Sequence, residues 1–406
     1  MTRASRPPVR LTPRLALMGG IMAIGSLSVD MYLPAFPQMA ADFRATSAEI
    51  SNTLAVFLLG TGLGQVIAGP LVDRYGRRRP LIVGLIAYAL TCLLCAVAVD
   101  LGLFTLARGL SALAACTTSV AVRAMVRDLY DPVDAARVSS TMMLISGLAP
   151  VLAPLLGSLV LQVAPWRTIF WLLLAAGLLF TVAAWRTLRD TQADEHRASL
   201  APGVILRDYW MLLHSRELLV PSIAAGLSFA GLFAYIAGTP EVLISGRGLP
   251  QAAYALIFGA NALAMVVMSQ FNKRWVLRHH PARILRRALR VQAATAALAC
   301  LASLFWTLPL PLLCLALMLY VAPISLVGGN AAALALAPHG QHAGKAAALS
   351  GMLSMGLGSV GAALAGLVHD GTERPVLALM ALTTLLAVAV VRLRRRAGDG
   401  HAADEN

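Results

Sequence analysis

Long apolar runs separated by short polar segments make up most of this chain. A helix needs about 20 apolar residues to cross roughly 30 Å of hydrocarbon, and runs of about this length can be drawn twelve times. The predicted spans are residues 15–36, 51–71, 80–99, 103–125, 138–161, 167–186, 216–239, 251–272, 288–307, 310–333, 346–368 and 374–392. The pattern predicts an all-α integral membrane protein with twelve transmembrane helices.

One longer segment, residues 187–215, is mixed in charge and poor in apolar periodicity, and it separates two sets of six predicted helices. We therefore expect an N-terminal six-helix half (1–186), a cytoplasmic linker (187–215), a C-terminal six-helix half (216–396) and a cytoplasmic tail (397–406). Two sets of six helices suggest pseudo-symmetric halves. The basic segment after the eighth predicted helix weakly echoes the one after the second.

Composition and charge agree with a membrane protein. Of 406 residues, 58% are hydrophobic and 13% are charged, which argues against a soluble globular fold. The net charge of +14 comes from short clusters between the apolar runs, so it indicates topology rather than a nucleic-acid partner. With the N-terminus inside, 28 of the 33 Lys and Arg residues fall on the cytoplasmic side and four outside, while Arg108 lies within a helix. We expect both termini in the cytoplasm.

The sequence offers no motif for chemical catalysis or ATP binding, so we expect neither an enzyme nor an ATP-driven pump. All five cysteines lie in apolar runs. Cys92 and Cys95 have CxxC spacing but no polar ligands near them in the sequence, and we interpret them as packing residues. We therefore predict no metal and no cofactor, with a proton gradient as the energy source.

The segment between the second and third predicted helices is the most distinctive in the chain. It reads G-P-L-V-D-R-Y-G-R-R-R-P from Gly69 to Pro80, and its glycines and prolines predict a tight turn. It resembles the loop between helices 2 and 3 of the major facilitator superfamily, G-x-L-x-D-R-x-G-R-R/K-x-x-L. The alternative is an ordinary basic loop of an unrelated membrane protein. The matching residues are Gly69, Leu71, Asp73, Arg74, Gly76, Arg77, Arg78 and Leu81.

Two further segments resemble a narrower branch, the Bcr/CflA group of drug-resistance transporters. The first is D-M-Y-L-P-A-F-P from Asp30 to Pro37, and the second is R-A-M-V-R-D-L-Y from Arg123 to Tyr130. The resemblance implies a drug:proton antiporter of the major facilitator fold, which works by alternating access. In the second segment, Arg123, Arg127 and Asp128 are expected to form an inner gate with Asp73, although a charged rim without a gating role stays open.

Asp30 and Arg108 are the acid and the base predicted to be buried in the first half, away from the ends of the apolar spans. Buried charges are costly in lipid, so both should face the bundle interior. Counted from the predicted outer helix ends, each lies about 9 Å deep. We expect them to communicate across a central cavity and to couple transport to protons; a permanent ion pair is the alternative.

The fifth predicted helix contains Gly147, Pro150, Pro154 and Gly157 in the order G-L-A-P-V-L-A-P-L-L-G. This resembles the helix 5 motif of the superfamily's antiporters and implies close packing that limits proton leak; a simple packing bend is the alternative. In the fourth helix, Ser111 stands where the family motif R-x-x-Q-G has glutamine. The position of Arg108 is therefore open to question.

Four polar or aromatic residues are candidates to line a substrate cavity. They are Tyr32, Tyr235, Glu241 and Asn261. Tyr32 can instead anchor at the membrane interface, and Glu241 can be a solvated residue at a helix end.

The expected function is proton-coupled efflux of small amphipathic drugs, of the chloramphenicol or bicyclomycin kind, across the bacterial inner membrane. A proton-coupled exporter of a metabolite such as a nucleobase or an amino acid is the alternative. The expected partners are a small-molecule substrate, protons and the lipid bilayer, without nucleic acid, and the expected state is a monomer.

Overall fold

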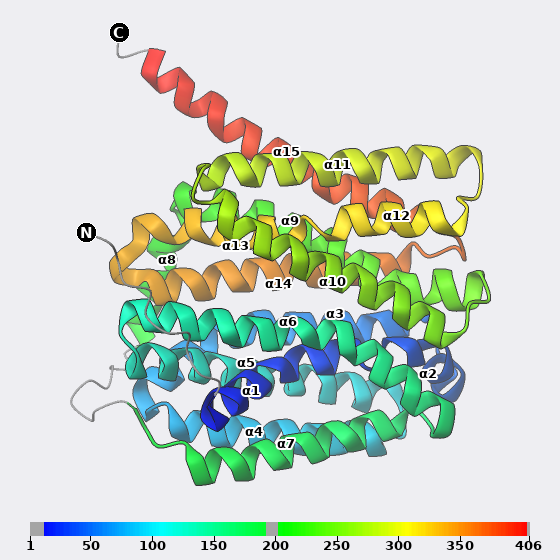
Figure 1. The fold of residues 1–406 in the computed structure, drawn as a ribbon, viewed down its shortest axis with the longest axis horizontal. Coiled ribbons are helices and arrows are strands. Elements are labelled where there is room, and N and C mark those ends of the chain that lie inside the picture. The colour runs from blue at the N-terminus through cyan, green and yellow to red at the C-terminus, as the bar shows by residue number, and fades with distance from the viewer. Residues whose placement is uncertain (1–11, 192–201, 404–406) are drawn as a thin grey trace.

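The computed structural model describes residues 12–191 and 202–403, and these are arranged as helices joined by short turns, without strands (Figure 1). Twelve helical segments are long and apolar enough to cross a membrane, which confirms the twelve predicted spans. The predicted tail residues 404–406 and part of the predicted linker, residues 192–201, lie outside the described residues, as do residues 1–11.

The first half contains six membrane-spanning segments, the first of which is broken into α1, η1 and α2. Its elements are α1 (Pro13–Asp30), η1 (Leu33–Ala35), α2 (Phe36–Phe43), α3 (Ser47–Tyr75), α4 (Arg78–Val97), α5 (Leu101–Leu129), α6 (Pro132–Val163) and α7 (Arg167–Thr187). A short helix, α8 (Pro202–Leu213), then leads to the second half.

The second half also has six spans, and its first and fourth are broken. Its elements are α9 (Arg216–Pro240), η3 (Glu241–Gly246), α10 (Gln251–Trp275), α11 (Pro281–Phe305), α12 (Leu310–Val321), α13 (Ile324–Leu336), η4 (Ala337–His342), α14 (Ala343–Leu367) and α15 (Arg374–Ala403). Figure 1 shows the two halves side by side, with α4 and α7 at one outer edge and α11 at the other.

Local sequence explains where several helices begin. Thr46 and Glu49 form a reciprocal capping box at the start of α3, with the Thr46 backbone N–H donating to Glu49 at 2.8 Å. Asp100 caps α5 by accepting a hydrogen bond from the Leu103 backbone N–H at 2.8 Å. Pro281 opens α11 in the first helical turn, where its missing N–H costs nothing.

The two halves meet along small residues. Helix α3 packs on α14, and α6 packs on α10. A Cβ placed on Gly366 of α14 would lie 3.0 Å from the Cα of Ala48, so the two backbones are in near contact at that end of the bundle. Nearby, Ser359 donates a hydrogen bond to the Ala55 carbonyl at 2.7 Å. The halves are therefore closed against each other at the end of the bundle that holds the α2–α3 turn.

Candidate functional site

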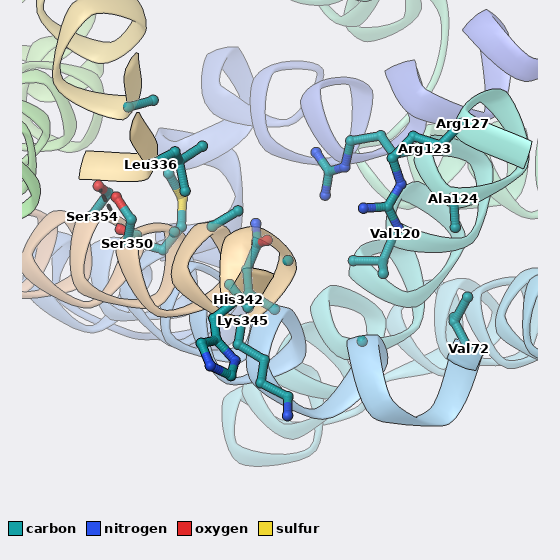
Figure 2. Close-up of a pocket in the computed structure, with 18 of the residues that line it drawn as sticks. Val72, Val120, Arg123, Ala124, Arg127, Leu336, His342, Lys345, Ser350 and Ser354 are labelled. Atoms are coloured by element: carbon teal, nitrogen blue, oxygen red, sulfur yellow. Dashed lines mark hydrogen bonds between the residues drawn. The ribbon is translucent and has the colours of Figure 1, made fainter. Parts of the chain in front are cut away.

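A cavity of about 950 Å³ separates the halves at the opposite end, which holds the α3–α4 turn (Figure 2). Helices α1, α3, α5 and α6 line it from the first half, α9, α13, η4 and α14 line it from the second, and α8 contributes Tyr209. Apolar side chains form much of its wall, and they include Met22, Met142, Phe229, Leu336 and Met355. Its volume suits a drug-sized molecule.

The charged groups around this cavity are mostly cations. Figure 2 shows Arg123 and Arg127 of α5 on one side, with His342 and Lys345, at the start of α14, across from them. Asp73 is the only carboxylate among the described lining residues, and Arg77 neutralises it through an ion pair of 2.6 Å. The cavity therefore combines apolar walls with a cationic rim.

Asp30 lies beyond the far end of this cavity and is only 4% exposed. It is the last residue of α1, eight residues after the cavity residue Met22, or about 12 Å along the helix. Within the described residues, its carboxylate has neither a hydrogen bond nor an ion pair. The turn that follows it, η1, contacts α9 and α10 of the second half. Asp30 therefore sits between the halves, in the part that is closed here.

Arg108 occupies an aromatic cage instead of a salt bridge. Its guanidinium carbon lies 4.4 Å from the ring centroid of Tyr32 and 4.3 Å from that of Phe57. The side chain is 1% exposed, and its Nε and Nη2 atoms are buried without a partner among the described residues. No hydrogen bond joins it to Ser111, which is too short to act as the glutamine of the family motif would. Cation–π attraction is thus the main contact holding the charge.

The structure does not bring Asp30 and Arg108 together, so the alternative of a permanent ion pair is wrong for this conformation. The reason lies in the end of α1. Residues two apart on a helix point to nearly opposite sides, and Tyr32 packs under Arg108. Asp30 is therefore turned away from Arg108 and toward the second half. Their joint role in proton coupling stays a prediction.

Tyr32 is not an interfacial anchor, because it is 1% exposed and its hydroxyl lies 3.2 Å from that of Thr53. Tyr235 and Asn261 form a pair near Asp30, in which the Asn261 amide donates to the Tyr235 hydroxyl at 2.9 Å. None of these three lines the cavity. All three are buried, in the region between the halves that also holds Asp30.

Glu241 lies elsewhere, in η3 at the closed end of the bundle. Its carboxylate is 3.9 Å from the Nε2 atom of His369, and it does not line the cavity described above. The prediction that Glu241 belongs to the cavity is not met in this conformation, because Glu241 follows α9 at the closed end of the bundle, opposite the cavity.

The fifth span packs directly on the break in the first. A Cβ added to Gly157 of α6 would collide with the carbonyl oxygen of Met31, the residue after Asp30. Gly147, at the other end of the same motif, has more room, since its Cβ would lie 3.6 Å from Val266. The close packing implied by the resemblance is therefore concentrated at Gly157, where it fixes the backbone next to Asp30.

The turn between α3 and α4 is held by a network centred on Arg77. Its guanidinium donates to Asp73 at 2.6 Å and to Asp128 of α5 at 3.0 Å, and its backbone N–H donates to Asp190 at 2.9 Å. Gly76 has a φ of +82°, and Asp190 occupies the place where a side chain at Gly76 would lie. These residues lock three elements of the first half together.

This network changes the predicted inner gate. Asp73 and Asp128 do join it, but through Arg77, whereas Arg123 and Arg127 point into the cavity (Figure 2). Arg78 instead donates to the Trp185 carbonyl of α7 at 2.7 Å, and Arg74 is exposed. The hydrogen bonds of Arg77 join α3, α5 and the segment just after α7, so they brace the first half in this conformation.

Sequence reasoning missed several residues that the structure places at the site. They are Gln65, Tyr209, His342, Lys345 and Met355 at the cavity, and Tyr254 near Asp30. Tyr209 comes from α8, whose role as part of the cavity wall has no signal in the local sequence. In the sequence, Lys345 and His342 are a single charge and a histidine in a short loop, and nothing there indicates a cavity. Their position depends on how the two halves pack.

Comparison with known proteins identifies the family. The Major Facilitator Superfamily model matches residues 18–366. The chain is 33% identical over 376 residues to the uncharacterized MFS-type transporter YdgK of Bacillus subtilis, covering 92% of this chain and 93% of that protein. This chain therefore belongs to the Major Facilitator Superfamily.

Other relatives are named for drug resistance. The bicyclomycin resistance protein homolog of Haemophilus influenzae is 30% identical, with 91% of this chain and 94% of that protein covered. The chloramphenicol resistance protein of Pseudomonas aeruginosa is also 30% identical, with 96% and 93% covered. These relatives support the resemblance to Bcr/CflA-type drug efflux transporters. Among solved structures, the nucleoside transporter NupG superposes with a TM-score of 0.74 at 14% identity, covering 93% of this chain and 99% of that chain, which shows the shared fold.

Proposed function

We propose that this chain exports small amphipathic molecules, of the chloramphenicol or bicyclomycin kind, in exchange for protons by alternating access. The observation that carries the proposal is the placement of one cavity and one buried carboxyl group on the same path between the halves. In this conformation Asp30 does not line the cavity, so a molecule bound in the cavity would not contact Asp30. Rocking of the halves would open the cavity and expose Asp30 in turn, which suits an exchange of two cargoes by alternating access.

The cavity lining supports an amphipathic cargo. The methionine and phenylalanine side chains offer an adaptable apolar wall. Arg123 and Arg127 offer hydrogen-bond donors to oxygen atoms of the cargo, whereas Asp73 is paired with Arg77 and Lys345 with Asp208. A cationic cargo would meet like charges at the rim, so neutral or anionic molecules fit this side better.

Asp30 supports the proton-coupled part of the proposal. An ionised carboxylate that is buried without a cation is costly to maintain. Helices α9 and α10 of the other half, which carry Tyr235 and Tyr254, contact η1 just after Asp30, so rocking of the halves changes the surroundings of Asp30. Opening the closed end would hydrate Asp30 and allow proton exchange, while closing it would favour the neutral acid.

The proposed orientation places the α3–α4 turn and both termini in the cytoplasm of a bacterial cell, with the protein in the inner membrane. The excess of Lys and Arg on that side supports this orientation. The cavity would then face the cytoplasm, where an exporter collects its cargo.

The proposal can be tested in everted inner-membrane vesicles with an inside-acid pH gradient. Chloramphenicol, a cationic dye and a nucleobase would be added in turn to vesicles with and without the protein. Dissipation of the gradient by chloramphenicol only when the protein is present supports drug export. Dissipation by the nucleobase alone supports the metabolite exporter. Cargo uptake without any change in the gradient would refute proton coupling.

A further inference from the structure

Four arginines lie along one face of α11, in the second half. Arg283, Arg286, Arg287 and Arg290 have the i, i+3, i+4, i+7 spacing that places residues on one side of a helix. Three are exposed and Arg286 is partly exposed. The opposite face, which includes Leu285 and Leu289, is buried in the core of that half. These four residues, the arginine face, therefore point directly away from the bundle.

The charges of the arginine face have no protein partner among the residues that the structure describes. None of the four guanidinium groups makes a hydrogen bond or an ion pair there. The sequence explains why, because no Asp or Glu occurs between Glu241 and Asp370. Exposed guanidinium groups without a partner in the chain are free to bind an anion from outside it.

The equivalent helix of the first half shows that this face is not a general property of the fold. Both α4 and α11 are the third span of their half and lie at the outer edges of the bundle (Figure 1). After its first turn, the exposed side of α4 is apolar, with Val83 65% and Leu90 56% exposed. Helix α4 has 20 residues and α11 has 25, so α11 is longer by about 7.5 Å.

The depth of the arginine face in the membrane follows from the exposed residues beyond it along α11. Beyond Arg290 the same side of α11 becomes apolar, with Leu298, Leu301 and Phe305 exposed by 55–78%. At the preceding end of α10, Trp275 is also exposed, as expected for an aromatic ring at a membrane interface. The change from arginine to leucine marks the boundary between the headgroup layer and the hydrocarbon. The arginine face therefore lies at headgroup depth.

From these observations we infer that the arginine face of α11 is a binding site for anionic phospholipid headgroups. The lipid phosphate supplies the missing negative charge, and guanidinium groups can bind it with two parallel hydrogen bonds. The acyl chains would lie along the exposed leucines below. A topology signal requires only basic residues in the loop, whereas here the charges occupy one helical face over about two turns. The site is independent of the transported cargo.

The test is native mass spectrometry of the purified full-length protein, titrated with phosphatidylglycerol or with phosphatidylcholine. The site variant is Arg286→Gln/Arg287→Gln/Arg290→Gln. The control variant, Arg79→Gln/Arg186→Gln/Arg189→Gln, removes the same charge from exposed positions of the first half. We expect wild type to prefer phosphatidylglycerol, and the site variant to bind it at least about tenfold more weakly. The control should change binding by less than about twofold.

Equal binding of the two lipids by wild type would overturn the inference. Equal losses in the site and control variants would also overturn it, because they would show a diffuse charge effect. If the triple variant does not fold, the single variant Arg287→Gln tests the same point, with an expected weakening of about fivefold. The exposed position of Arg287 makes that variant structurally mild, and an unchanged affinity would again count against the site.

Discussion

Replacing Gly157 with alanine tests the packing between α6 and the break in the first span. Alanine ordinarily stabilises a helix relative to glycine by about 1 kcal/mol. At Gly157, however, the new methyl group would collide with the Met31 carbonyl oxygen, which is backbone and cannot rotate away. Overpacking of this kind costs about 1–3 kcal/mol or more. The matched control is Gly147→Ala, whose methyl group would lie 3.6 Å from Val266, an ordinary contact.

We expect Gly157→Ala to be less stable than Gly147→Ala by about 2 kcal/mol. Thermal unfolding of the two purified variants in the same detergent would give their order, and a denaturant titration would give the size of the difference. Transport should fall only in Gly157→Ala, because the collision displaces the backbone next to Asp30. Equal stability and equal transport in both variants would refute the claim that this contact is tight.

Three further outcomes follow from the structure. Arg77→Ala should lower the free energy of unfolding by about 2–3 kcal/mol, since it removes the buried cation that joins Asp73 to Asp128. Arg77→Lys should recover part of this loss in the same denaturant titration. The hydrogen bond from Lys345 lowers the pKa of Asp208 from its ordinary value. The docking of α8 should therefore be intact above that ordinary value and weaken as the pH falls through the lowered pKa. Lys345→Met should remove this pH dependence. Hydrogen exchange of the backbone amides of α8, measured as a function of pH, would test this dependence. Arg123→Gln should weaken transport of anionic cargo more than that of neutral cargo in a competition assay, and an equal effect on both would remove Arg123 from cargo selection.

Much of the fold could be predicted from the sequence because crossing a bilayer imposes one length and one composition on every span. All twelve spans were predicted on this basis. The pattern did not show the π-helix at 241–246, which follows the predicted span 216–239, or the bend near Pro323 inside the span 310–333. Proline lies at both places, but Pro150 and Pro154 lie inside the continuous helix α6, so proline alone does not say which spans break.

The candidate site was only partly predictable. Asp30 and Arg108 stand out because charge is rare inside apolar runs, and the structure buries both. Their depth could be counted from helix ends, but their direction could not, because it depends on how α1 ends near Tyr32. The aromatic cage around Arg108 combines rings from three spans, those of Tyr32, Phe57 and, at 5.9 Å, Phe170. Likewise, the pairing of Arg77 with Asp190 joins residues more than a hundred positions apart.

The central claim is that Asp30 exchanges the proton that drives export. The most direct measurement compares wild type with Asp30→Asn in proteoliposomes, using a cargo found in the vesicle assay. Two activities are followed: cargo movement driven by a pH gradient, and exchange of labelled for unlabelled cargo without a gradient. The account predicts that Asp30→Asn loses the first and keeps the second. Gradient-driven transport at the wild-type rate in Asp30→Asn would contradict it.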